Sequence, residues 1–239
     1  MQLHGESETD IKARHKIAFP HNIHTHISSS QPPSLVLIPT MTQIGIFPAS
    51  GALGTSTYTH LLSQVPNDKV TLINRFPEKV PEKYVSVTKK QASYESSAED
   101  LQAVFSGLDV LFLISYPSHV RQYRTKVHTK AIDAAVKTGV KHIFYSSLGF
   151  ASIGKDTTKA EVMGAHLDSE KHLRELSEKN PGFTFTSVRE GLYSESFPIY
   201  TSFLDLKNPP SKIQIPHDGS GPGVSWVKRD ELHKASFIR

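Results

Sequence analysis

The sequence contains no cysteine, no long apolar run and no cluster of basic residues. Without cysteine, the chain can form no disulfide and use no thiolate. A reducing compartment is the simplest fit, and we expect a cytoplasmic protein. No stretch approaches the roughly 18 apolar residues that a membrane-spanning helix needs, so we expect no membrane partner. The net charge is +4, but the longest basic runs are pairs, which argues against a nucleic-acid-binding face.

The first 40 residues lack the hydrophobic periodicity of the rest of the chain. They hold five of the thirteen histidines, a run of three serines and two adjacent prolines. This composition is typical of a disordered segment, so we expect residues 1–40 to form a disordered N-terminal extension. Three closely spaced histidines in it would bind a metal only weakly without an ordered scaffold. The HExxH pattern is also absent, so we expect no metal site.

From residue 42 onward, short apolar runs alternate with amphipathic stretches. The runs over residues 43–47, 70–75, 109–115, 141–147 and 183–190 are typical of strands buried in a parallel sheet. Residues 84–87 indicate a further strand, and we expect helices within residues 53–65, 98–107, 119–139 and 165–180. This alternation predicts an α/β fold of the Rossmann type, a doubly wound parallel sheet with helices on both faces, over residues 41–239.

A glycine-rich turn joins the first strand to the first helix. Laid on the dinucleotide-binding pattern, it reads Pro48-x-x-Gly51-x-x-Gly54, so a proline replaces the first glycine. Gly51 lets the backbone approach a pyrophosphate, and Gly54 lets the helix pack closely. The phosphate is bound by N–H groups at the helix N-terminus, which follow the proline. We therefore expect Pro48, Ser50, Gly51, Leu53 and Gly54 to bind a dinucleotide; a tight structural turn is the alternative.

The end of the second strand indicates which dinucleotide is bound. An acidic residue there would bind the ribose 2′-hydroxyl of NAD, whereas an arginine accommodates the 2′-phosphate of NADP. The chain offers Asn74 and Arg75, with no acid before Glu78. The Arg75 guanidinium can bind a phosphate bidentately. The sequence therefore favours NADP (NADPH) over NAD, with an exposed surface arginine as the alternative.

Several segments, in this order, resemble the NmrA-like family. They are "GIFPASGALGTSTYTHLL", "FSGLDVLFLISYPS", "VKHIFYSSLGFA", "AHLDSEKHL" and "VREGLYSESFPIY", within residues 42–233. The family consists of atypical relatives of the short-chain dehydrogenases/reductases and includes triphenylmethane reductase and type-two quinone oxidoreductases. The resemblance implies a Rossmann-type core that binds NAD(P). Some members are reductases, and others are regulators that sense the nucleotide without catalysis.

Three residues are candidates for catalysis. Typical short-chain dehydrogenases use Tyr-x-x-x-Lys, but none of the eight tyrosines here has a lysine four residues later. Ser146 ends the fifth strand, where a site is expected; a loop-capping serine is equally consistent. His166 and Glu170 lie at i, i+4, and the resemblance places them beside the cofactor, where His166 would donate a proton; surface support of the helix is the alternative. Tyr193 would face substrate or pack in the core.

Two further loops belong to the predicted site by topology. Ser115, Tyr116 and Pro117 follow the fourth strand and should border the cofactor. Gly191 follows the sixth strand and matches the family's Arg-x-Gly-x-Tyr pattern, in which it would make room for the cofactor. The family continues past the last residue of this chain, so we expect a C-terminally truncated substrate lobe.

Two functions remain open from the sequence. The first is an NADPH-dependent oxidoreductase that reduces a quinone or a related conjugated carbonyl, with a small molecule as its substrate. The second is a non-catalytic regulatory protein that senses NADP(H) and binds a protein partner.

Overall fold

The computed structural model describes residues 42–149, 157–158, 161–200, 203–205, 207–215, 220, 223 and 225–236. All of them belong to one compact unit, Leu37–Arg239. The predicted extension over residues 1–40 lies outside the described residues and stays a prediction. No helix in the described ranges is both long enough and apolar enough to span a membrane.

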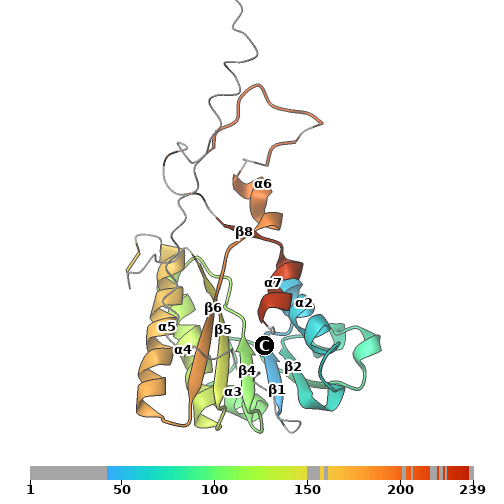
Figure 1. The fold of residues 1–239 in the computed structure, drawn as a ribbon, viewed down its shortest axis with the longest axis vertical. Helices are drawn as coiled ribbons and strands as arrows, with labels where there is room; N and C mark the ends of the chain where they lie inside the picture. The colour runs from blue at the N-terminus through green and yellow to red at the C-terminus, as the bar shows by residue number, and fades with distance from the viewer. Residues whose placement is uncertain are drawn as a thin grey trace, which may run out of the picture. The chain divides into compact units, whose positions relative to one another are not determined.

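A parallel sheet of six strands forms the centre of the described part of the chain (Figure 1). Its strands are β1 (Ile44–Phe47), β2 (Val70–Asn74), β3 (Thr88–Gln91), β4 (Val110–Leu113), β5 (His142–Leu148) and β6 (Thr184–Glu190). They lie in the order β3-β2-β1-β4-β5-β6, so the chain winds outward in both directions from β1. The strand order reverses between β1 and β4, which is where doubly wound folds bind their ligands.

Helices cover both faces of the sheet, as the sequence predicts. The longer ones are α2 (Gly51–Leu61), α3 (Ala98–Phe105), α4 (Arg121–Lys137), α5 (Glu161–Lys179) and α7 (Arg229–Ser236), and α6 (Phe197–Tyr200) is a single turn. Short 3₁₀ helices span Asn67–Lys69, Pro77–Lys79, Glu82–Tyr84 and Ser194–Ser196. Strands β7 (Leu192–Tyr193) and β8 (Trp226–Val227) form a separate two-stranded sheet.

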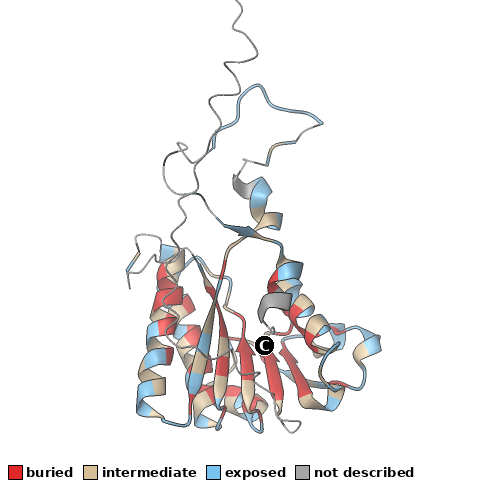
Figure 2. Cartoon of the chain, viewed as in Figure 1, coloured by how far each residue is buried: buried red, intermediate tan, exposed pale blue. Residues whose placement is uncertain are grey.

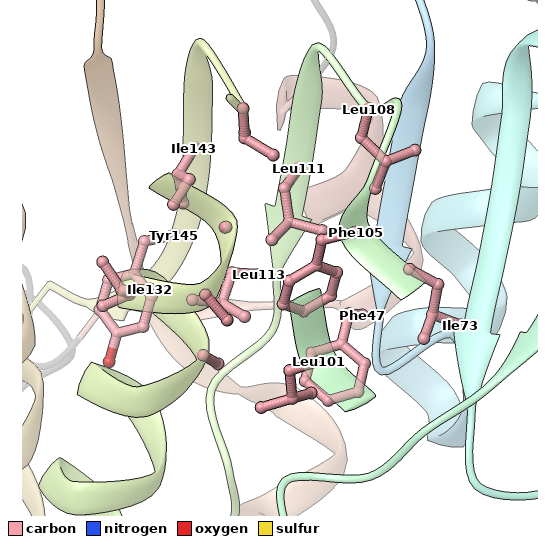
Figure 3. Close-up of a cluster of buried hydrophobic side chains, with 14 of the residues drawn as sticks. Phe47, Ile73, Leu101, Phe105, Leu108, Leu111, Leu113, Ile132, Ile143 and Tyr145 are labelled. Carbon is pink, nitrogen blue, oxygen red and sulfur yellow. The ribbon is translucent and has the colours of Figure 1, made fainter. Parts of the chain in front are cut away.

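The core is divided by the sheet into two clusters. Successive strand residues point to opposite faces: Phe47, Leu111 and Tyr145 pack with α3 and α4 on one face (Figure 3). Ile46 and Phe112 pack with α2 on the other. Figure 2 shows the central strands coloured as buried along most of their length. Burial on both faces explains why these strands read as continuous apolar runs.

The third strand lies later in the sequence than predicted. Residues 84–87 do not form a strand: Tyr84 ends a 3₁₀ helix, and Val85 is exposed. The strand is instead β3, with the polar sequence TKKQ, and it pairs only with β2. Because β3 is an edge strand, it does not need the apolar pattern of the central strands, and lysines are common there. The prediction followed hydrophobicity and therefore missed it.

Two of the predicted helices are followed by a glycine. Gly107 follows α3 with a φ of 82°, and Gly139 follows α4 with a φ of 88°. Only glycine adopts this left-handed conformation without strain. At its start, α3 is fixed by a capping box in which Ser97 and Asp100 bond each other's backbone N–H groups.

The last helix, α7, lies beside α2 (Figure 1). Asp230 accepts a hydrogen bond from the Ser56 hydroxyl at 3.2 Å, and the ring of His60 lies 3.2 Å from the same oxygen. The sequence predicts a helix near Asp230, and the structure confirms it. The predicted truncation of a substrate lobe stays a prediction.

Candidate functional site

The glycine-rich turn between β1 and α2 has the geometry of an anion cradle. Gly51 begins α2 with a φ of 72°, and a Cβ added there would meet no atom within 4 Å. A Cβ on Gly54 would lie 2.6 Å from the Pro48 carbonyl oxygen, so only glycine lets α2 pack this closely on the turn. The carbonyl of Pro48 is thus the atom that limits the residue at position 54 to glycine.

The N-terminus of α2 keeps its donors for a ligand. Ser50 is the N-cap residue with extended backbone, but its side chain makes no capping hydrogen bond. The first N–H groups of an α-helix have no partner within the helix, and they carry partial positive charge. Such an end binds phosphate well. Leu53, which the sequence also places in the site, packs its side chain against the core cluster on the α2 face.

Two cations flank an aromatic ring at the end of β2. The Arg75 guanidinium carbon lies 4.9 Å from the centre of the Phe76 ring, and the Lys79 ammonium lies 4.4 Å from it. Phe76 is 43% exposed. The buried Asn74 side chain fixes this turn by accepting the Phe76 N–H at 2.9 Å. The sequence analysis named Arg75 but not Lys79. Lys79 lies only four residues after Arg75, beyond Pro77, so it could have been recognised as a second cation at this site.

The loop after β4 is held from both sides. Ser115 donates its N–H to the Ser146 hydroxyl oxygen at 2.9 Å, and Arg124 donates to the Ser115 hydroxyl at 3.0 Å. Tyr116 donates its N–H to His128 Nε2 at 2.8 Å. Ser146 is itself buried. The geometry therefore favours a loop-holding role for Ser146, the alternative that the sequence left open, and it leaves Pro117 at the tip beyond the two bonded N–H groups.

The Tyr116 side chain connects this loop to the loop after β3. Its hydroxyl donates to Glu95 Oε1 at 2.9 Å. Burial opposes ionisation of Glu95, but hydrogen bonds from Tyr116 and Ser93 and the nearby charge of Arg75 together lower the pKa of this carboxyl. The loops after β2, β3 and β4 thus meet at the edge of the sheet where the strand order reverses.

His166 belongs to a buried network of rings. It is 1% exposed, and burial, helped by the charge of Arg124, lowers its pKa to about 3. Its Nδ1 lies 3.1 Å from the Tyr145 hydroxyl, and that hydroxyl lies 3.2 Å from His128 Nδ1. The ring is therefore neutral at physiological pH, so the proton donation hypothesised from the sequence would have to come from a neutral imidazole, which is a weak acid.

The hydrogen bonds also fix the tautomers in this network. His128 Nε2 accepts the Tyr116 N–H, so its proton sits on Nδ1, which donates toward Ser169 Oγ at 2.9 Å. The Tyr145 hydroxyl can then donate to His166 Nδ1, which leaves the His166 proton on Nε2. That Nε2 is buried and has no hydrogen-bond partner among the described residues.

Glu170 does not pair with His166, although both lie on one face of α5. Its carboxylate accepts the Ser147 hydroxyl and a bidentate pair of bonds from Arg189, at 3.1 and 2.6 Å. Glu170 is buried. The two residues are therefore neither surface support for the helix nor an acid–base pair: Glu170 ties α5 to β5 and β6.

The end of β6 carries a second buried carboxyl. Glu190 is 2% exposed, and burial raises its pKa to about 7, against the opposing hydrogen bond from Tyr193. Tyr193 donates its hydroxyl to Glu190 Oε2 at 2.6 Å, while Glu190 Oε1 is buried without a partner among the described residues. The sequence analysis missed Glu190. No local pattern marks it, because the other residues of β6 are exposed or only partly buried and Glu190 alone is buried.

Gly191 has a packing role in this structure. A Cβ added to it would lie 2.6 Å from the Ser225 carbonyl oxygen, and the Leu192 N–H donates to the same oxygen at 2.9 Å. Glycine is therefore needed for β7 to approach β8. The Arg229 guanidinium lies 4.7 Å from the centre of the Tyr193 ring and covers it.

Comparison with known proteins shows that the chain belongs to an NAD(P)H-binding family. The model of a family described as NAD(P)H-binding matches residues 49–215. An NmrA-like family domain-containing oxidoreductase, flvB, of Aspergillus flavus is 29% identical over 187 residues, which cover 77% of this chain and 57% of that protein. Quinone oxidoreductase 2 of Escherichia coli is 34% identical over 155 residues, which cover 64% of this chain and 50% of that protein.

The fold also resembles that of a solved structure. The crystal structure of Citrobacter sp. triphenylmethane reductase complexed with NADP(H) matches with a TM-score of 0.64 and 26% identity, over 81% of this chain and 64% of that one. The chain spans about half the length of the curated relatives that it matches.

Proposed function

Because this chain belongs to the NAD(P)H-binding family, and is NmrA-like within it, we propose that it binds NADPH and reduces a quinone or a related conjugated carbonyl compound. The observation that carries the cofactor part is the pair of cations, Arg75 and Lys79, at the end of β2. In doubly wound folds this position faces the 2′ position of the adenosine ribose. Two positive charges suit a 2′-phosphate better than a hydroxyl, although Glu78 lies between them in the sequence.

Other parts of the chain are suited to bind the pyrophosphate and the nicotinamide of the cofactor. The uncapped N-terminus of α2 would bind the pyrophosphate, and Gly51 leaves open space above the turn. The loops after β4, β5 and β6 would border the nicotinamide, since ligands lie outside the carboxyl ends of the strands. Bound NADPH supplies a hydride. The chain has to orient it, exclude water and supply a proton.

The substrate class comes from the similarity to quinone oxidoreductase 2 and to triphenylmethane reductase. Both names denote reduction of conjugated compounds. Hydride transfer to such a compound needs mainly an oriented nicotinamide and an electrophile. The missing Tyr-x-x-x-Lys pair therefore does not count against this reaction.

The alternative is a non-catalytic protein that senses NADP(H) and binds a protein partner. The absence of Tyr-x-x-x-Lys in this sequence is consistent with this alternative as well as with the reductase. Both candidates require NADPH binding, and they differ in turnover and in the protein partner.

The test is to mix the chain with NADPH and a series of quinones and to follow the near-ultraviolet absorbance of NADPH. We expect quinone-dependent consumption of NADPH, with one equivalent of hydroquinone formed for each NADPH oxidised. Binding of NADPH without consumption by any quinone would support the sensor. A chain that binds neither NADPH nor NADP⁺ would contradict both.

A further inference from the structure

The buried carboxyl of Glu190 and the hydroxyl of the partly buried Tyr193 form a hydrogen-bonded pair at the end of β6. Their oxygens are 2.6 Å apart, in the range of short charge-assisted O–H···O bonds. Glu190 has a second oxygen, Oε1, that is buried without a partner among the described residues. A buried polar atom without a partner is costly, so its presence needs a reason beyond the stability of the fold.

The surroundings hold the pair in place. Gly191 lets β7 run against the segment before β8, and Arg229 covers the Tyr193 ring. The groups that act on the pair electrostatically are Arg124 from α4, Arg229 from α7 and Tyr145 from β5. The pair lies at the carboxyl edge of the sheet, the edge at which doubly wound folds bind their ligands.

We propose that the Tyr193 hydroxyl donates the proton in the reduction and that Glu190 reprotonates it. This inference rests on the proposed function. As the hydride adds to the conjugated carbonyl, its oxygen gains negative charge and takes the Tyr193 proton. The phenolate oxygen takes the proton of the Glu190 carboxylic acid, and the Glu190 carboxylate then takes a proton from water. The balance is one NADPH, one quinone and one proton giving NADP⁺ and hydroquinone.

The electrostatics give each group a distinct part in these transfers. Burial, together with the charge of Glu190, raises the pKa of Tyr193, which makes its hydroxyl a weaker acid, so proton donation depends on prompt reprotonation of the phenolate by Glu190. Burial also raises the pKa of Glu190 to about 7, which keeps part of it protonated at neutral pH and ready to donate. His166 does not compete for this role, because its pKa of about 3 leaves it neutral.

The test compares Glu190→Gln and Tyr193→Phe with Glu178→Gln, a carboxyl on the exposed surface of α5. Steady-state rates with NADPH and a quinone are measured from about pH 5 to pH 9. In the intact chain we expect kcat to fall as pH rises through about 7. We expect Glu190→Gln and Tyr193→Phe to lower kcat about 100-fold, to leave KM for NADPH unchanged, and to remove the fall of kcat near pH 7. Glu178→Gln should match the intact chain.

Isotope-edited infrared spectroscopy gives a readout that is independent of rate. We expect a protonated carboxyl band that titrates near pH 7 and is missing in Glu190→Gln. Tyr193→Phe keeps the ring under Arg229, so it tests the relay even if Glu190→Gln fails to fold. Unchanged kcat and an unchanged pH profile in Tyr193→Phe, while the intact chain consumes NADPH, overturn the relay alone. Absence of turnover in the intact chain overturns the proposed function, and the relay with it.

Discussion

The two halves of the sheet differ in how far their charged and polar groups are exposed to solvent. Around β1, α2 and β2, the groups suited to bind a ligand are exposed: the N-terminus of α2, Arg75 and Lys79. Around α4, β5, α5 and β6, several charged and imidazole side chains are buried. All the buried charged or imidazole side chains among the described residues lie there, and they are Arg124, His128, His166, Glu170 and Glu190.

We infer that the first half binds the cofactor and that the second half carries out the proton transfer. The first half offers backbone donors and charges in water, which suit a large anionic cofactor that must enter and leave. The second half keeps ionisable groups away from water, where burial shifts their pKa values. Shifted pKa values gather at functional sites. The buried side-chain atoms without partners in the described ranges, on Arg124, His166, Ser187 and Glu190, also lie in this half.

The largest effect is expected from breaking the partly buried Arg189–Glu170 ion pair of the second half. Arg189→Met leaves the Glu170 carboxylate buried, with Ser147 as its partner among the described residues. Removing one partner of a buried pair costs about 3–5 kcal/mol, and we expect about 3 kcal/mol because the Arg189 side chain is 40% exposed. Urea unfolding measures this. The control is Lys171→Met, which removes an exposed pair with Glu175 and should cost about 0.5 kcal/mol or less. Equal losses in both variants would contradict the account.

The next effect concerns the turn of the first half. Gly54→Ala places a Cβ 2.6 Å from the Pro48 carbonyl oxygen, and overpacking of this kind costs about 1–3 kcal/mol. Because α2 must then move away from the turn, we also expect weaker NADPH binding. Gly182→Ala is the matched control, since a Cβ there meets no atom within 4 Å. Calorimetry and urea unfolding on both variants measure the difference, and unaltered NADPH binding in Gly54→Ala would argue against the cradle.

A smaller and more selective effect is expected at the end of β2. Arg75→Ala removes one charged partner of the 2′-phosphate, and hydrogen bonds to charged groups contribute about 1.5–3 kcal/mol. We expect NADPH affinity to fall about 10- to 100-fold while NADH affinity changes little. Calorimetric titration of both nucleotides measures this. Equal losses for NADPH and NADH would refute the phosphate role.

The smallest effect concerns the pH dependence of stability in the second half. The folded pKa of His166 is about 3, below an unfolded value near 6.5, so stability is lost as pH falls below about 6.5. Burial also lowers the pKa of His128, and this acts in the same direction. Glu190 acts oppositely: its folded pKa of about 7 exceeds an unfolded value near 4.3, so its contribution is lost as pH rises through 7.

We therefore expect Glu190→Gln to steepen the rise of the unfolding free energy between about pH 4.5 and 6.5. The change is at most about 1.4 kcal/mol per pH unit, the value for one proton. Urea unfolding across this range measures it, with Glu178→Gln as the control. Parallel pH profiles for the intact chain and Glu190→Gln would show that the carboxyl is not held protonated.

The sequence predicts the helices and central strands of both halves, but it indicates candidate site residues more readily in the first half than in the second. The glycine turn, the strand before it and Arg75 are local patterns, each readable within about 30 residues. The ring network of Tyr145, His128 and His166 joins side chains from three separate elements, β5, α4 and α5. Their burial depends on how α4 and α5 pack, and this packing cannot be inferred from a local sequence pattern. β3 escaped prediction for a different reason, since a polar edge strand carries no hydrophobic signal.

The most direct test of the division between the halves is a calorimetric titration of the intact chain with NADPH and with NADH. If the first half is the cofactor cradle, one NADPH binds per chain, about 10-fold or more tightly than NADH, because only NADPH carries the phosphate that Arg75 and Lys79 face. Absence of NADPH binding would contradict the account.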